Sequence, residues 1–125
     1  MKKIIRTANA PEPIGPYSQA VTYGGMLFIS GQIAINPASG ELENATITDE
    51  ATQVMQNLSA LLREANMGFE HVIKTSIYLS DMALFDEVNK VYAGFFLNNY
   101  PARETVAVRG LPKNVNVEIS MIAGK

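Results

Sequence analysis

The chain has 125 residues, 47% of them hydrophobic and 18% charged, which is ordinary for a globular protein with a real core. Its net charge of −2 and pI near 5.3 argue against a polyanion-binding protein. The chain has no cysteine and one histidine, which excludes disulfides, thiolate nucleophiles and zinc sites built from these ligands. No segment resembles a membrane span, a signal peptide or a nucleotide-binding glycine loop. We therefore expect one cytoplasmic domain, residues 1–125, that needs no cofactor or metal.

The N-terminal third predicts short strands separated by turns. Residues 3–7 form a β-type run, and residues 9–16 contain three prolines, which remove amide donors and fix φ. Residues 20–23 and 26–30 predict a hairpin across a two-glycine turn. The proline segment should be an ordered loop that aims the residue after it, Tyr17.

Two amphipathic helices are predicted next, with a β-run over residues 71–80 between them. The first covers residues 48–66, where apolar residues recur at helical spacing and Gly68 follows as a C-terminal cap. The second covers residues 81–98 and is stopped by Pro101.

The last two strands are expected over residues 104–109 and 115–123, paired across the turn between them. The element order predicts an α+β sandwich, with a mixed β-sheet and two helices on one face. The other face would carry aromatic, methionine, hydroxyl and charged side chains, a mixture typical of an interface. We therefore predict a homo-oligomer.

Arg103 is the strongest candidate for chemistry. A guanidinium suits bidentate contact with a carboxylate and stays charged, although most arginines at such places are simply exposed. Glu118 lies in the middle of the last strand and could take a proton from water and return it to a leaving amine. A solvent-facing strand residue explains Glu118 equally well. Pairing of the last two strands would bring it close to Arg103.

Five further residues are candidates for a substrate site, each with a structural alternative. Tyr17 could donate a hydrogen bond or only pack. Gly31, after Ser30, could let a ligand approach backbone amides or only permit a bulge. Thr105 could offer its amide and hydroxyl or reflect β-propensity, and Asn89 could hydrogen-bond a loop.

Taken together, these residues resemble the RidA family (reactive intermediate deaminase A, or YjgF-like proteins). The resemblance runs nearly end to end and is carried by the segments Ala10–Gln19, Phe28–Gln32, Phe85–Tyr92, Pro101–Val106, Leu111–Lys113 and Val117–Ile119. It implies a chorismate-mutase-like fold and a homotrimer with three clefts between subunits.

The resemblance also implies an activity, that of a 2-iminobutanoate/2-iminopropanoate deaminase. Such an enzyme hydrolyses reactive enamines and imines, such as 2-aminoacrylate or 2-aminocrotonate, to 2-keto acids and ammonia. By position, Arg103 would bind the substrate carboxylate and Glu118 would activate water. The cleft would be lined by Tyr17, Ser30 and Gly31, and Asn89 matches an asparagine frequent in the family.

Two residues depart from the family pattern. Thr105 stands where cysteine is common and keeps the backbone amide. Glu104 replaces a frequent serine and adds a negative charge beside Arg103, which would weaken anion binding. Two other functions stay open: a keto-acid-sensing or regulatory binding protein without turnover, and an endoribonuclease, which the acidic pI and lack of a basic patch disfavour.

Overall fold

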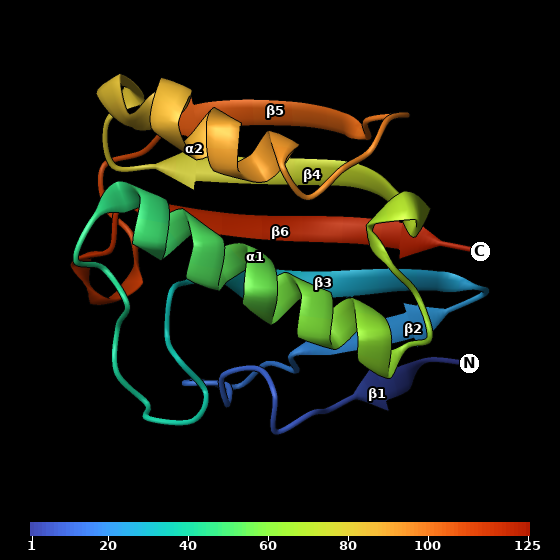
Figure 1. Ribbon diagram of the computed structural model, residues 1–125. Coiled ribbons are helices and arrows are strands. Elements are labelled where there is room, and N and C mark those ends of the chain that lie inside the picture. Colours follow the sequence, from blue (N-terminus) through green and yellow to red (C-terminus); the bar gives the residue numbers. More distant parts are fainter.

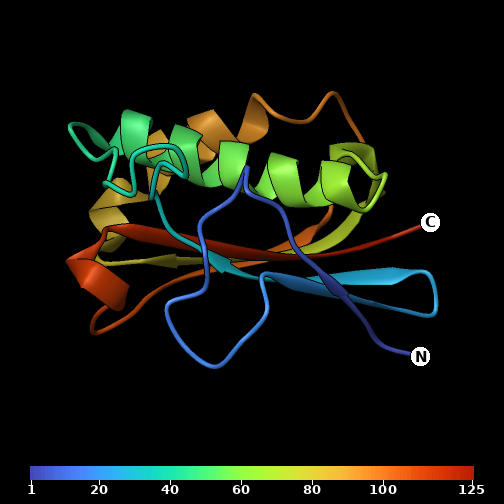
Figure 2. The same cartoon turned by 90° about the horizontal axis from the view of Figure 1, so that it is seen from below.

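The computed structural model describes all 125 residues. It contains a six-stranded sheet with two α-helices packed on one face (Figure 1). The strands are β1 (Lys3–Ile5), β2 (Ala20–Tyr23), β3 (Met26–Gln32), β4 (Val72–Leu79), β5 (Ala102–Ala107) and β6 (Val117–Gly124), and the helices are α1 (Ile47–Glu64) and α2 (Phe85–Ala93). Seen along the sheet, both helices lie on the same side (Figure 2). The expected α+β sandwich is confirmed. No helix is long and apolar enough to cross a membrane.

The strand order is β1-β2-β3-β6-β4-β5, and every pairing is antiparallel except that of β4 with β5. The expected pairing of the last two strands is therefore wrong. Helix α2 carries the chain back across the sheet, so β5 joins β4 in parallel at the edge. Strand β6 takes a central place because Val117, Ile119, Met121 and Ala123 are fully buried along one of its faces and need neighbours on both sides.

Helix α1 begins and ends with specific caps. The Thr46 side chain accepts a hydrogen bond from the amide of Asp49 at 3.0 Å. At the other end Asn66, not Gly68, takes the left-handed conformation, with φ 58°. The amide of Met67 donates to the carbonyl of Leu62 at 2.8 Å, which completes a Schellman motif. The expected glycine cap is wrong because asparagine also tolerates this conformation.

Helix α2 is shorter than its apolar pattern predicts. It ends at Ala93 and is followed by Gly94. Beyond it, the rings of Phe95 and Phe96 turn back onto Phe69, with centroids 5.5 and 5.4 Å apart. The apolar residues after Ala93 therefore close the core from a loop rather than from a helix.

The core lies between the helices and the sheet. Its fully buried members include Leu27, Val54, Met55, Leu58, Leu61, Leu62, Ile77, Leu79, Val117 and Ile119. Strand β4 departs from regular β alternation at Ile73, which is 49% exposed although Thr75, Ile77 and Leu79 are buried. An irregularity between Val72 and Lys74 shifts the register against β6 and reverses the side of Ile73.

Neither α-helix lies on the second face of the sheet (Figure 2). Its side chains include Phe28 and Val106, each 42% exposed, and the half-buried Tyr78, Glu118 and Ser120. We call this surface the open face. Its mixture of aromatic, aliphatic and polar groups is as expected from the sequence.

Candidate active site

The proline loop over residues 9–18 is held in place by Gln19, which is buried. The Gln19 side-chain amide donates to the carbonyls of Thr7, Ala10 and Pro11 at 3.0, 3.2 and 2.9 Å. Its oxygen accepts from the amide of Thr7 at 2.8 Å. One glutamine therefore supplies hydrogen-bond partners to the backbone of a segment whose prolines cannot donate ladder hydrogen bonds.

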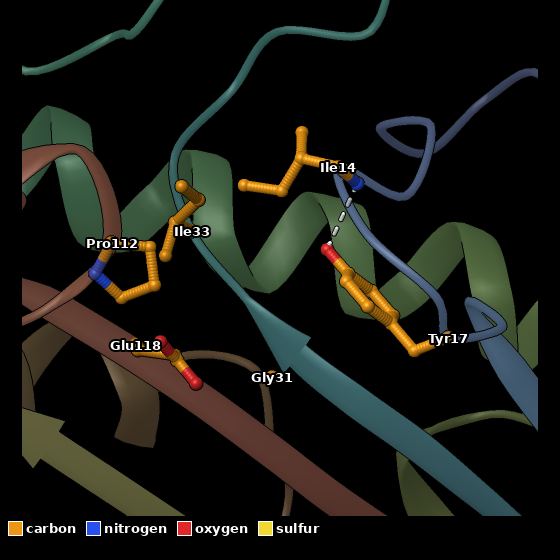
Figure 3. A pocket seen from close by; sticks show the side chains of 6 residues that line it. All are labelled: Ile14, Tyr17, Gly31, Ile33, Pro112 and Glu118. Atoms are coloured by element: carbon orange, nitrogen blue, oxygen red, sulfur yellow. Dashed lines mark hydrogen bonds between the residues drawn. The ribbon is translucent and has the colours of Figure 1, made fainter.

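This loop presents Tyr17 to a cavity, as expected. The Tyr17 hydroxyl oxygen accepts a hydrogen bond from the amide of Ile14 at 3.2 Å (Figure 3). Because that bond uses a lone pair, the phenol proton remains available for donation. The Ser30 hydroxyl instead donates to the carbonyl of Ser18 at 2.6 Å. Ser30 therefore fastens the loop to β3.

Gly31 lies in a bulge of β3 and against the carboxyl group of Glu118. Ile29 pairs with Met121 and Gln32 with Ile119, so Ser30 and Gly31 together face a single residue of β6. A Cβ atom at Gly31 would lie 2.8 Å from Cδ and 3.0 Å from Cγ of Glu118. The bulge expected as the structural alternative for this glycine is therefore present, and the group that lies against it is the side chain of Glu118.

Glu118 borders a cavity of about 280 Å³, lined by Ile14, Tyr17, Gly31, Ile33, Pro112 and Glu118 (Figure 3). Burial raises the pKa of its carboxyl group. Ile33 is held by Asn57, whose side-chain amide donates to the carbonyls of Ile33 and Ile35 at 3.0 and 2.9 Å. The apolar wall residues Ile14, Ile33 and Pro112 are not among the candidates from the sequence, because nothing in their residue type distinguishes them from packing residues.

Arg103 lies in a second cavity of about 400 Å³, lined by Asn89, Tyr92, Ala93, Tyr100, Pro101 and Arg103. Its Nη1 donates to Oδ1 of Asn89 at 2.8 Å. Its Cζ atom lies 5.0 Å from the ring centroid of Tyr92 and 5.7 Å from that of Phe85. None of the ion pairs in the chain involves Arg103. Its charge is thus supported by ring faces and an amide, with no carboxylate to neutralise it.

The two departures from the family pattern point to opposite faces of β5. Thr105 is on the helix-covered face with Arg103, and its hydroxyl oxygen is buried without a hydrogen-bond partner. Glu104 lies on the open face, where it accepts from the Ser76 hydroxyl and pairs with Lys74 Nζ at 2.9 Å. These contacts, that of Ser76 first, lower the pKa of Glu104. Its charge is already partnered and directed away from Arg103, so the expected weakening of anion binding has little basis.

Within one chain, Arg103 and Glu118 lie on opposite faces of the sheet. In the register of β4, Arg103 is opposite Thr75 and Glu118 is opposite Tyr78. Positions three apart on a strand point to opposite sides. The expectation that strand pairing would bring the two residues together is therefore wrong. The structure groups Arg103 with Asn89, and Glu118 with Tyr17 and Gly31, as two separate clusters. No group of three or more metal-ligating side chains converges anywhere in the chain.

Comparison with known proteins supplies a family for this arrangement. The family model described as endoribonuclease L-PSP matches residues 7–125. A RutC family protein of Pyrococcus horikoshii is 49% identical over 125 residues, which are 100% of this chain and 99% of that protein. The 2-iminobutanoate/2-iminopropanoate deaminase of Homo sapiens is 41% identical over 98% of this chain and 90% of that protein.

One solved structure extends the likeness to three dimensions. E. coli TdcF, crystallised with bound serine, is 40% identical, covers 98% of both chains and superposes with a TM-score of 0.94. Relatives of this identity and coverage share one fold, which is the chorismate-mutase-like sandwich expected from the motifs. The chain therefore belongs to the RidA (YjgF-like) family.

Proposed function

We propose that this protein hydrolyses reactive enamine and imine intermediates, such as 2-aminoacrylate or 2-aminocrotonate, to 2-keto acids and ammonia. The observation that carries the proposal is the guanidinium of Arg103, which is stacked, half-buried and without a carboxylate partner in its own chain. The deaminase name of the human relative and the serine bound to E. coli TdcF support it.

The carboxylate of the substrate would bind to Arg103. Asn89 occupies Nη1 and leaves the other donors of the guanidinium fork for a second planar group. The unpartnered hydroxyl of Thr105 lies on the same face of β5, two positions along the strand. A carboxylate at Arg103 would therefore meet a positive charge and the side-chain amide of Asn89 in the same cavity.

The reacting end of the substrate would lie against Glu118 and Tyr17, and these belong to the other cluster. Since one chain keeps the clusters on opposite faces, we propose a homotrimer in which Arg103, Asn89 and Thr105 come from one subunit. The neighbouring subunit would supply the wall with Glu118. The unshielded open face supports an assembly of this kind.

The proposed reaction is an addition followed by an elimination. The enamine first tautomerises to its iminium form by protonation at carbon. Water then forms a bond to C2 while Glu118 accepts one of its protons, which gives a carbinolamine. Glu118 returns the proton to the amino group, the C–N bond breaks, and the hydroxyl proton passes to solvent as the C=O bond forms. This proton balances the one that solvent supplies to carbon in the first step. The products are a 2-keto acid and ammonia, and the protein is unchanged.

Two features of the Glu118 wall suit this chemistry. Its raised pKa places the carboxyl group nearer to the working pH, which favours both uptake and return of a proton. Tyr17, whose oxygen already accepts from Ile14, keeps a proton to donate to the hydroxyl or amino group of the intermediate. Because an iminium hydrolyses in water unaided, orientation and a single proton carrier are sufficient, and such help is typically worth ~10²–10⁴-fold.

A coupled assay tests the proposal. Serine or threonine dehydratase generates the enamine, and lactate dehydrogenase reports early formation of the 2-keto acid. The wild-type protein should accelerate this phase and Arg103→Ala should not. Arg109→Ala, which removes an exposed arginine from the β5–β6 connection, is the matched control and should accelerate fully. No acceleration by the wild type, or full acceleration by Arg103→Ala, would contradict the proposal.

Two further measurements on the same protein test the alternative functions. Calorimetric binding of pyruvate or 2-ketobutyrate without any acceleration would favour a sensing or regulatory protein. Cleavage of RNA that survives extensive purification would favour an endoribonuclease, although the net charge of −2 offers no basic surface for a polyanion.

A further inference from the structure

Tyr92 closes a ring of contacts around Arg103. It is 4% exposed, and its hydroxyl donates to Oγ1 of Thr75 at 3.0 Å. Thr75 is fully buried on β4 and is the residue that pairs with Arg103 in the β4–β5 ladder. Asn89, which holds Nη1 of Arg103, lies one turn before Tyr92 on α2. Arg103 therefore pairs with Thr75, which bonds to Tyr92, and the guanidinium meets both the ring of Tyr92 and the amide of Asn89.

We propose that Tyr92 is a positioning residue that fixes the guanidinium of Arg103 for carboxylate binding. This inference rests on the proposed function, in which Arg103 binds the substrate carboxylate. The ring of Tyr92 borders the cavity of Arg103, but its hydroxyl is bonded to Thr75, so Tyr92 offers the substrate no polar group and would act through the guanidinium.

The contacts of Tyr92 restrain the guanidinium of Arg103 in a way that the hydrogen bond to Asn89 alone does not. A single hydrogen bond at Nη1 holds one corner of the guanidinium but leaves rotation about the side-chain torsions. The Tyr92 face, with its centroid 5.0 Å from Cζ, favours a cation against its negative π surface. Phe85 is farther, at 5.7 Å. An aromatic ring and an amide together restrict the fork to few orientations, which lowers the entropy lost on binding.

The hydroxyl of Tyr92 explains why a tyrosine fits here better than a phenylalanine. Burial alone would be met by any large apolar residue, and a buried hydroxyl is unfavourable without a partner. The bond to Thr75 satisfies it and fixes the ring plane under Arg103. Burial also raises the pKa of Tyr92, against smaller opposing effects of the Thr75 hydrogen bond and the Arg103 charge, so the hydroxyl stays a neutral donor.

The test compares two ligands that differ only in the group bound by Arg103. Pyruvate carries the carboxylate, and pyruvamide replaces it with a neutral amide of similar shape. Calorimetry on the full-length protein should show that Tyr92→Leu weakens pyruvate binding about tenfold and leaves pyruvamide binding unchanged. Tyr92→Phe keeps the ring but not its anchor and should weaken pyruvate by about threefold. Tyr23→Leu removes an exposed tyrosine and should change neither.

Arginine side-chain ¹⁵N relaxation gives a readout that does not need a ligand. The Arg103 Nε–H signal, assigned by its absence from Arg103→Lys, should report a rigid group in the wild type and a mobile one in Tyr92→Leu. Equal weakening of both ligands, unchanged pyruvate binding, or a guanidinium that stays rigid in both Tyr92 variants would overturn the inference. If Arg103→Ala bound pyruvate as well as the wild type, the carboxylate role of Arg103 itself would fail, which is a different result.

Discussion

The carboxyl group of Glu118 lies where a side chain at Gly31 would lie. A Cβ atom built there comes within 2.8 Å of Glu118 Cδ and 3.0 Å of Cγ. The contact joins a bulge of β3 to the centre of β6, two strands that are neighbours in the sheet. The glycine therefore sets the position of the proposed water-activating carboxylate, although it contributes no functional group.

Gly31→Ala should reduce the rate of imine hydrolysis while changing stability little. The Cβ atom would displace the end of the flexible Glu118 side chain, so the backbone need not move. Loss of a positioned general base predicts a fall of ~10²-fold or more in the coupled dehydratase assay. Urea unfolding should place the free energy of unfolding within about 1 kcal/mol of the wild type.

Gly110→Ala is the control for this variant. A Cβ atom at Gly110 meets nothing within 4 Å, so hydrolysis should continue at the wild-type rate. If Gly31→Ala also retained full activity, the placement of Glu118 against Gly31 would be irrelevant to the reaction.

Glu118→Gln should bind pyruvate with nearly wild-type affinity, hydrolyse the imine slowly, and be more stable than the wild type at pH 7–8. Burial raises the pKa of Glu118 above its usual value of 4.5. Glu118 therefore has no unfavourable effect on stability below that value and becomes destabilising as pH rises through the raised pKa, where folding must accommodate a charge. Urea unfolding at pH 4 and pH 8 should show a difference between the proteins only at the higher pH. Loss of keto-acid binding in this variant would mean that Glu118 is structural.

Glu104→Gln should change the pH dependence of stability in the opposite direction to Glu118→Gln. The pKa of Glu104 is lowered by the Ser76 hydroxyl and by Lys74, so its contribution to stability is present above pH 4.5 and is lost as pH falls through the lowered pKa. The variant should be slightly less stable than the wild type at pH 7. Because Glu104 faces away from Arg103, calorimetry should find pyruvate affinity unchanged; a clear rise in affinity would show that its charge opposes anion binding.

Asn89→Asp should weaken pyruvate binding by at least about tenfold, because it places a carboxylate on Nη1 of Arg103. The new ion pair would compete with the substrate for the guanidinium. The matched control is Asn98→Asp, which adds the same charge at an exposed position. Calorimetric affinities that fall equally in both variants would indicate a general effect of charge and not a contact with Arg103.

Local patterns in the sequence were sufficient for most elements of this fold. The helical spacing of apolar residues located α1, and the two-glycine turn located the hairpin of β2 and β3. The wrong predictions concern the ends of the helices, where tertiary contacts determine the conformation of the chain. The chain from Phe95 leaves the helix to meet Phe69, and Asn66 replaces the expected glycine cap. Neither choice is visible in residue type alone.

The candidate site was identified from motifs, but its geometry depends on topology. The turn before β6 suggested a hairpin with β5, whereas the insertion of β6 between β3 and β4 places Arg103 and Glu118 on opposite faces. Tyr92 falls within the predicted second helix, yet its place under Arg103 follows only from the parallel β4–β5 register. Sequence spacing carries no information on which strands become neighbours.

The opposite placement of Arg103 and Glu118 leads to a test of the proposed cleft between subunits. Arg103→Ala should not accelerate hydrolysis and Glu118→Gln should do so only slowly, but a 1:1 mixture unfolded and refolded together should recover activity. If each cleft takes Arg103 from one subunit and Glu118 from its neighbour, random assembly gives about a quarter of the clefts both wild-type residues. Arg103→Ala mixed with Asn89→Asp is the control, since both changes affect the same wall and no cleft can regain it.

Native mass spectrometry must accompany this mixing experiment, because recovery requires that hybrid oligomers form. The proposal predicts trimers that contain both variants, with activity recovered only in the mixture of Arg103→Ala and Glu118→Gln. This result would place one catalytic site between two chains. Hybrid trimers without recovery would mean that the two residues never share a cleft, and sedimentation as a monomer at micromolar concentration would contradict the assembly itself. A monomer could not unite the two clusters. Arg103 and Glu118 lie opposite positions of β4 that are three residues apart, so they point to opposite faces of the sheet.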